Sequence, residues 1–163
     1  MPSRTLRTAA AAALTAGLIL TFPQPAQAAK RCVSQSGSVW YDLASPYSGS
    51  LNGAWVTLQT ARSNGAARAI VHPGSSYRFR SGDILSIDRS IRELPKYDPQ
   101  TGKPWKTHRI EQMGGWDYCE STLHSTDSIR TGPIDGLRHA TRVCLRRGTS
   151  LQCTNDWYVD TNG

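Results

Sequence analysis

The sequence predicts an all-β fold: a single antiparallel β-sandwich, or a partly open barrel, that two disulfides stabilise. Three observations support this class. Short strand-like runs alternate with turn residues, helical periodicity is weak throughout, and four cysteines follow an N-terminal export signal. We expect residues 1–28 to be a cleaved signal peptide and residues 29–163 to form one secreted domain, whose 135 residues are a usual size for a single domain.

The N-terminal segment has the three parts of a secretory signal. Arg4 and Arg7 give a positive start, residues 9–20 form an apolar run, and Ala26-Gln27-Ala28 has the small-x-small pattern of a cleavage site. The apolar run is shorter than the roughly 20 residues that a membrane-spanning helix needs, and no later segment is as apolar. We therefore predict a secreted, extracellular protein without a membrane span.

Clusters of Gly, Pro, Asn and Ser separate the strand-like runs. In the run at residues 55–60, alternation indicates one buried face, and the β-branched Val56 and Thr57 favour a strand over a helix. Residues 125–138 contain two glycines and few apolar residues, so we interpret them as a long loop. The strands that we predict are at residues 38–43, 55–60, 67–71, 77–80, 84–88, 140–146 and 151–159.

The four cysteines, Cys32, Cys119, Cys144 and Cys153, allow three pairings, and their even number in an exported protein indicates two disulfides. A two-residue loop at Gly148-Thr149 suits a type II′ turn, which needs a positive φ at its first position. Counting outward from this loop places Cys144 opposite Cys153 in a closely spaced, non-hydrogen-bonded pair. We therefore predict the disulfides Cys144–Cys153 and Cys32–Cys119.

A zinc site is the alternative use of these residues. Four residues separate Cys119 from His124, and four separate His139 from Cys144, a set of ligands that suits tetrahedral zinc. It would leave the other two cysteines to pair with each other. Because export to an oxidising medium favours disulfides, we expect no metal and no cofactor.

Residues 95–105 form the most informative loop. Asp98-Pro99 is typical of the start of a turn, and Gly102 can supply the left-handed residue that ends it. We expect strands on both sides of the loop, so that Tyr97 and Trp105 face each other across a hairpin.

Two resemblances to known proteins add to this picture. Residues 98–105 resemble the Asp-box hairpins of sialidase-like propellers, which place an Asp, a Gly and a Trp around a turn, although this chain has two more residues between the Asp and the Gly. The box is structural in that family, so this resemblance implies no catalysis. Residues 82–90, 142–144 and 153–158 resemble segments of uncharacterised small secreted proteins of actinobacteria, which implies a fold type and secretion and no activity.

The best candidates for catalysis near the loop are His108 and Glu111. If the segment that begins at Thr107 is a strand, these two side chains point to opposite faces, and only a bulge or a twist at the end of the strand would let them share a substrate. Arg109 and Glu111 would then lie on one face, where an ion pair is the simpler interpretation.

A ribonuclease-like hydrolase is the alternative that uses histidine. His108 and His124 would act as general acid and base, and Lys103 or Lys106 would stabilise the transition state. No spacing in the sequence forces the two histidines to meet.

Aromatic and basic residues lie close together between positions 97 and 118. Flat aromatic rings beside cationic donors suit sugar rings, a polyanionic glycan or stacked single-stranded bases. Trp116 and Tyr118 belong to this cluster, and Trp116 is more typical of a core residue. The ligand-binding residues that we predict are Tyr97, Trp105, Lys103, Lys106 and Arg109.

These observations favour a monomeric, non-catalytic binding or structural domain that recognises an extracellular or envelope polymer, either a glycan or a polyanion. Without residues 1–28 the chain has 17 Lys and Arg against 12 Asp and Glu, a balance that attracts polyanions, nucleic acid included, although the bases are scattered. The alternatives are the ribonuclease-like hydrolase and a protein-binding inhibitor that presents the hairpin between Tyr97 and Trp105.

Overall fold

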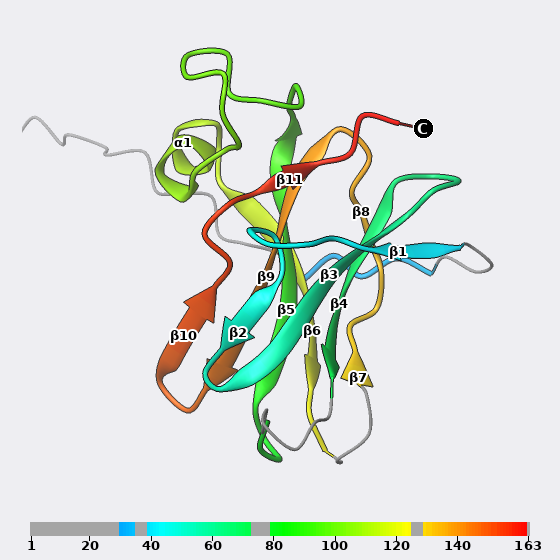
Figure 1. Cartoon of the computed structure of the whole chain (residues 1–163), viewed down its shortest axis with the longest axis vertical. Helices are drawn as coiled ribbons and strands as arrows, with labels where there is room; N and C mark the ends of the chain where they lie inside the picture. The colour runs from blue at the N-terminus through cyan, green and yellow to red at the C-terminus, as the bar shows by residue number, and fades with distance from the viewer. Residues whose placement is uncertain (1–29, 35–38, 73–78, 125–128, 163) are drawn as a thin grey trace, which may run out of the picture.

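The computed structural model describes residues 30–34, 39–72, 79–124 and 129–162 (Figure 1). Two antiparallel sheets pack together, and one short helix lies at one end of the sandwich, which confirms the predicted all-β class. The predicted signal peptide at residues 1–28 lies outside the described residues. So does part of the predicted strand at 77–80, and the described residues 79 and 80 are not in a strand.

The first sheet has six strands in the order β1-β3-β4-β7, with β2 beside β3 and β8 beside β4. Alternation of side chains on its long strands sends every second residue into the core. Its strands are β1 (Trp40–Asp42), β2 (Gly49–Leu51), β3 (Ala54–Ala61), β4 (Ala66–His72), β7 (Ile129–Arg130) and β8 (Ile134–Asp135). The predicted long loop at 125–138 therefore contains two short strands, because both pair with β4.

The second sheet has five strands in the order β10-β9-β5-β6, with β11 beside β9. Its strands are β5 (Ile84–Glu93), β6 (Trp116–Thr122), β9 (His139–Arg147), β10 (Ser150–Cys153) and β11 (Tyr158–Val159). The single strand predicted at 151–159 is thus two strands, both paired with β9. The central pair of the sheet, β5 and β9, comes from segments far apart in the chain.

The main core fills the space between the two sheets. The first sheet supplies Val56, Leu58, Ala69 and Val71, and the second supplies Leu85, Ile87, Val143 and Leu145. All eight are fully buried, so the outward positions on the same strands are those that solvent and ligands can reach.

A second core lies under the helix α1 (Thr107–Gln112) and the 95–105 loop, at the end of the sandwich (Figure 1). Trp105, Ile110 and Trp157 pack there, together with Leu94 and Val159. Burial of these large side chains stabilises an end of the sandwich that the sheets alone would leave open.

The helix α1 corrects the strand predicted to begin at Thr107. Arg109, Glu111 and the other unbranched polar residues of this segment have good helix propensity, and only Ile110 is buried. Gly114 and Gly115 follow with φ of 108° and 85°, which ends the helix within two turns.

The predicted β9–β10 hairpin and both predicted disulfides are confirmed. Gly148 has a φ of 55°, and the register pairs Arg147 with Ser150 and Cys144 with Cys153. Cys144–Cys153 and Cys32–Cys119 are both bonded, and no described cysteine is free. The alternative zinc site is therefore wrong, because its two cysteines belong to different disulfides.

Candidate ligand-binding site

A groove of about 240 Å³ crosses the outer face of the five-stranded sheet. Residues of β5, β6 and β9 form its floor, and Leu151 of β10 borders it. Because Leu85 and Ile87 face the core, Ser86 and Asp88 between and beyond them face outward. The residues that line the groove are Ile84, Ser86, Asp88, Trp116, Tyr118, Glu120, Arg142, Cys144, Arg146 and Leu151.

Cross-strand pairing arranges the lining residues in rows. In one row, Asp88 on β5 lies between Arg142 on β9 and Tyr118 on β6. In the next row, Ser86 lies between Cys144 and Glu120. Side chains so placed on one face of adjacent strands are close enough to interact directly, so a ligand in the groove could contact residues of all three strands at once.

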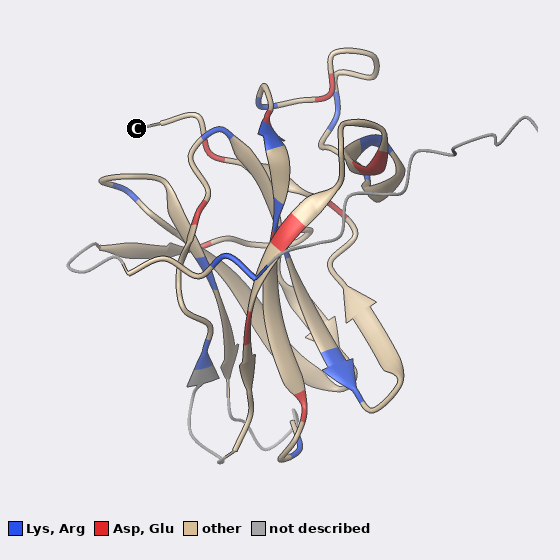
Figure 2. Ribbon diagram, turned by 180° about the vertical axis from the view of Figure 1, so that it is seen from behind, with Lys and Arg blue, Asp and Glu red and all other residues tan. Residues whose placement is uncertain are grey.

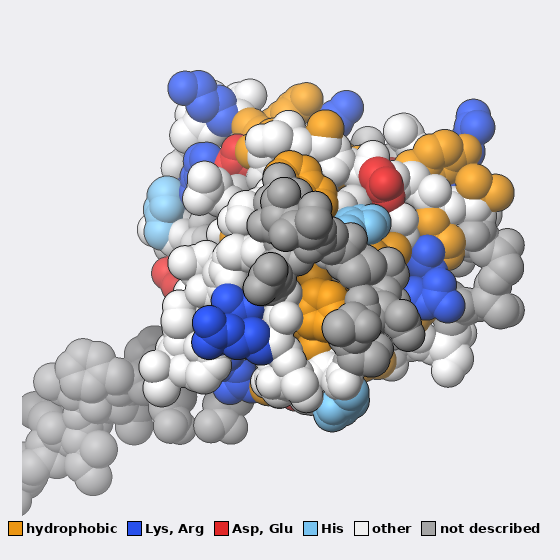
Figure 3. Space-filling model, turned by 60° about the horizontal axis from the view of Figure 1, so that its bottom comes forward, with side chains coloured by type: hydrophobic (Ala, Val, Ile, Leu, Met, Phe, Trp, Pro, Cys, Tyr) orange, Lys and Arg blue, Asp and Glu red, His pale blue; other side chains and the backbone are white. Residues whose placement is uncertain are grey.

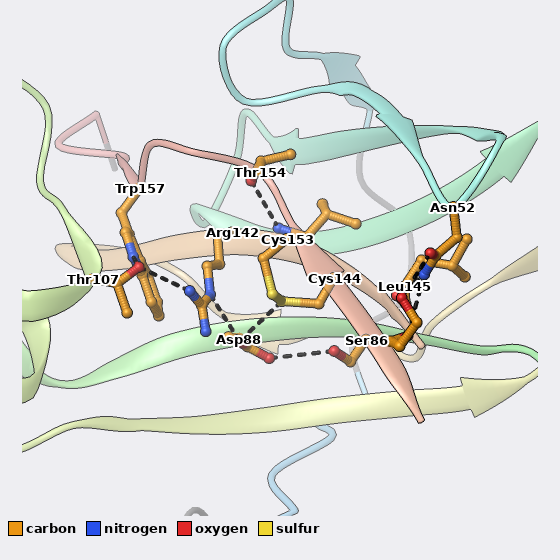
Figure 4. Close-up of a disulfide and its surroundings, with 12 residues drawn as sticks. Asn52, Ser86, Asp88, Thr107, Arg142, Cys144, Leu145, Cys153, Thr154 and Trp157 are labelled. Atoms are coloured by element: carbon orange, nitrogen blue, oxygen red, sulfur yellow. Dashed lines mark hydrogen bonds and ion pairs between the residues drawn. A yellow bond between two sulfur atoms is a disulfide. The ribbon is translucent and has the colours of Figure 1, made fainter. Parts of the chain in front are cut away.

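An ion-pair network forms the end of the groove near α1 (Figure 4). Arg142 Nε lies 2.9 Å from Asp88 Oδ2, and Arg142 Nη1 donates a hydrogen bond of 2.9 Å to Thr107 Oγ1. The Arg142 Cζ atom lies 4.8 Å from the ring centroid of Trp116 and 4.4 Å from that of Trp157. Arg142 is thus held by a carboxylate, a hydroxyl and two aromatic faces.

Asp88 is fully engaged in this network. Burial raises the pKa of Asp88, while the neighbouring Arg142 acts in the opposite direction. Ser86 Oγ donates to Asp88 Oδ1 at 3.3 Å, and Asp88 Oδ2 also lies 3.3 Å from Cys144 Sγ. That sulfur is oxidised and has no proton to donate, so the contact is packing. Asp88, Cys144 and Cys153 lie close enough to share a metal ion, but neither bonded sulfur is a thiolate ligand.

The other end of the groove is more open. Arg146 Nη2 lies 4.0 Å from Glu120 Oε2, and Leu151 is 59% exposed beside them. Both arginines of the groove therefore face a carboxylate, and the net formal charge of its lining is zero. Two partly exposed aromatic residues, Trp116 and Tyr118, lie on the same face of β6.

The predicted ligand-binding residues of the 95–105 region lie outside this groove. Trp105 is 1% exposed and its Nε1 donates to the Pro95 carbonyl, so the ring is part of the second core and a ligand cannot reach it. Its backbone bridges to Trp157, and it does not face Tyr97. Tyr97 is 47% exposed, and the predicted left-handed Gly102 has a φ of 64°.

Two of the three predicted cations of this region have acidic partners. Lys106 forms an ion pair with Asp156, and Arg109 Nε lies 3.0 Å from Asp98 Oδ2. The hydrogen bond from Arg109 holds the pKa of the Asp98 carboxyl below its ordinary value. The expected ion pair between Arg109 and Glu111 is therefore replaced by one with Asp98. Lys103 is exposed, and its backbone bridges to that of Asp98 across the turn.

The candidate catalytic histidines are far apart in the fold. His108 lies on α1, which precedes β6, and His124 follows the opposite end of the seven-residue strand. A strand of this length spans about 23 Å, so the two imidazoles cannot act on one bond. His108 and Glu111 are three apart on the helix and share a face, contrary to the strand-based expectation, and both are exposed.

The sequence does not predict the groove, although two of its residues, Trp116 and Tyr118, belong to the aromatic cluster between positions 97 and 118. The sequence pattern that indicates this outer face is a polar residue at every second position of an apolar strand. Ser86 and Asp88 alternate with Leu85 and Ile87 in this way. Alternation identifies an outer face and does not show which strands lie side by side.

Basic residues do not form one dominant patch on the described surface. Basic and acidic positions are interspersed along the ribbon in Figure 2, and the end of the molecule in Figure 3 shows separate basic groups. Within the described residues no helix is both long and apolar enough to cross a membrane. Comparisons with protein-family models, curated proteins and solved structures found no match to this chain.

Proposed function

We propose that this protein is a secreted, non-catalytic binding domain whose groove holds a segment of a neutral extracellular or envelope glycan. One observation carries the proposal: Tyr118 is partly exposed on the outer face of β6, inside a groove bordered by polar side chains, and Trp116, whose ring lies against Arg142, is two residues before it. Residues two apart on a strand are about 7 Å apart, so Tyr118 offers the stacking surface and Trp116 extends the aromatic edge of the groove.

The polar residues of the groove complement this aromatic edge. The carboxylate of Glu120 follows the aromatic residues on β6, and the hydroxyl of Ser86 and the guanidinium of Arg146 lie on the neighbouring strands β5 and β9. These groups supply both donors and acceptors for sugar hydroxyls. A concave site with aromatic surface and a few polar groups is the usual form of a site for a small ligand or polymer segment.

The balance of charge favours a neutral glycan over a polyanion in the groove. Arg142 is committed to Asp88, and Arg146 faces Glu120. A polyanion would have to compete with both carboxylates, whereas neutral sugars need no change in either pair.

The engagement of Asp88 supports a binding role over hydrolysis. Both of its oxygens already have partners, Arg142 and Ser86, and it is buried beneath the groove surface. A general acid or nucleophile needs an oxygen within reach of the substrate.

The test is retention on neutral polysaccharides, with chitin and cellulose as insoluble probes and xylan in affinity electrophoresis. Tyr118→Ala should weaken retention about tenfold, because a stacking partner is lost while the core is untouched. Tyr97→Ala removes an exposed tyrosine outside the groove and should bind like the wild type. Loss of retention in Tyr97→Ala alone, or unchanged retention in Tyr118→Ala, would place the ligand elsewhere.

A protein-binding inhibitor is the second candidate, and the fixed turn at Asp98 favours it. Asp98 is buried, accepts the Gln100 amide at 3.0 Å and pairs with Arg109, so the exposed Tyr97 is presented on a rigid loop. Size-exclusion chromatography with trypsin and with subtilisin tests this role. A 1:1 complex that Tyr97→Ala abolishes would support it, and free elution with both proteases would count against it.

A further inference from the structure

The outer face of the six-stranded sheet, opposite the groove, has a different chemistry. Because Ala67, Ala69 and Val71 of β4 are in the core, Arg68 and the other alternate residues of this strand point outward. Arg68 is partly buried there, although it belongs to no ion pair among the described residues.

Three strands fix the position of Arg68. Its Cζ atom lies 4.0 Å from the ring centroid of Trp40 on β1, and its Nε donates a hydrogen bond of 2.7 Å to Gln59 Oε1 on β3. Gln59 is itself held by Asp42, which accepts a bond of 2.6 Å from Gln59 Nε2. The guanidinium is therefore oriented in advance, and its two terminal nitrogens have no hydrogen-bond partner in the described part of the chain.

A second arginine lies beside it. Arg130 on β7 pairs with Ile70 of β4, which faces outward two residues after Arg68. This places Arg130 diagonally across from Arg68, about 7–8 Å away along the sheet. Figure 2 shows the basic position on β7 in blue. Burial and then the neighbouring Arg130 lower the pKa of Arg68, whereas Asp42 acts in the opposite direction.

We propose that Arg68 and Arg130 form an oxyanion site that binds the carboxylate or sulfate groups of an acidic polysaccharide. A planar guanidinium presents two donors in the geometry of such an anion, and a second cation beside it on the same face adds further donors. The bound anion also offsets the repulsion between the two arginines. This site is separate from the groove and does not depend on the function proposed for it.

An acidic polysaccharide fits this face better than single-stranded nucleic acid. Nucleic acid that binds along a sheet needs aromatic rings on which bases stack. The Trp40 ring is already covered by Arg68, so it cannot serve as such a platform. What remains available is charge and hydrogen-bond donors, which sulfate and carboxylate groups can use.

The experiment compares binding of dextran sulfate with binding of uncharged dextran of the same length. Arg68→Gln and Arg130→Gln should each weaken dextran sulfate binding at least fivefold. The matched control Arg92→Gln removes an exposed arginine from β5 on the other sheet and should change it less than twofold. Arg68→Lys keeps the charge and loses the fork, so it should also weaken binding. The plot of log affinity against log salt should become shallower by about one for each lost contact.

Several outcomes would overturn the site. Equal losses of affinity in Arg92→Gln and Arg130→Gln would show that only net charge matters. Failure of the wild type to bind dextran sulfate would rule the site out. Tighter binding of an oligothymidylate of equal charge would overturn the choice of polysaccharide. If Arg68→Gln does not fold, Arg130→Gln still tests the site, because Arg130 is exposed and its replacement leaves the fold intact. Tyr118→Ala should bind dextran sulfate normally, which separates this site from the groove.

Discussion

The two disulfides should contribute unequally to stability, and the difference can be calculated from their positions. Cys32–Cys119 joins residues 87 apart, whereas Cys144–Cys153 joins residues 9 apart. In the chain-entropy treatment, removal should lower the free energy of unfolding by about 4.6 kcal/mol for the long loop and about 2.6 kcal/mol for the short one. The double variants Cys32→Ala/Cys119→Ala and Cys144→Ala/Cys153→Ala make this comparison directly.

The structure makes the two variants well matched in their other effects. Each removes one fully buried sulfur, from Cys119 or from Cys144, so the packing losses are similar and largely cancel in the comparison. The long disulfide also anchors an N-terminal segment in which the Arg31 amide donates to the Tyr118 carbonyl at 2.7 Å. The β9–β10 hairpin, by contrast, keeps its two-residue turn and its ladder without a disulfide.

Guanidinium denaturation monitored by tryptophan fluorescence is the appropriate assay. We expect the variant without the Cys32–Cys119 disulfide to be less stable than the other by about 2 kcal/mol. Equal losses, or a larger loss from breaking the hairpin disulfide, would refute the reasoning. A change in the slope of the unfolding free energy against denaturant concentration would mean that the unfolded state had changed as well, so the slopes of the two variants are compared first.

Two further predictions concern buried ionisable groups. Asp88→Ala should lower the free energy of unfolding by about 3–5 kcal/mol, because the buried Arg142 loses its carboxylate. The double variant Asp88→Leu/Arg142→Met should lower it much less. Equal losses of stability in thermal melts of the two variants would contradict this. Burial raises the pKa of Tyr158 from 10.0 to about 12. Between these values the unfolded phenol ionises and the native one does not, so the stability that this tyrosine contributes is complete below about pH 10 and is lost as the pH rises towards 12. Ultraviolet titration should show that Tyr158→Phe lacks the late ionisation step, and an unchanged late step would exclude the assignment.

The β9–β10 hairpin could be predicted from sequence because its determinants are local. A two-residue loop at Gly148-Thr149 fixes the register of everything that follows on both sides. The position of Cys144 opposite Cys153 is then a matter of counting. The remaining disulfide, Cys32–Cys119, follows from having only two cysteines left.

The segment at 104–112 could not be predicted in the same way. A helix of six residues is too short for its periodicity to be recognised, and its stability comes from burying Ile110 in the second core. The same core takes up Trp105, which in the sequence is surrounded by polar residues typical of an exposed loop. In both cases a tertiary contact outweighs the local pattern.

The groove depends on an order of strands that the sequence does not contain. β5 lies between β6 and β9, whose segments are separated by residues 123–138, and only this order brings Tyr118 and Arg142 to either side of Asp88. Pairing between strands distant in sequence is set by the whole core and not by any one segment.

The two outer faces of the sandwich use arginine in different ways, and the cross-strand partner explains why. Opposite Arg142 the register places Asp88, which neutralises the guanidinium, so that Arg142 becomes part of the fold. Opposite Arg68 it places Gln59, whose carbonyl oxygen accepts one hydrogen bond and cannot cancel the charge. An oriented cation without a carboxylate in direct contact still attracts an anion, whereas one in an ion pair is already neutralised. The identity of one opposing residue thus decides whether an arginine stabilises its sheet or remains available to a ligand.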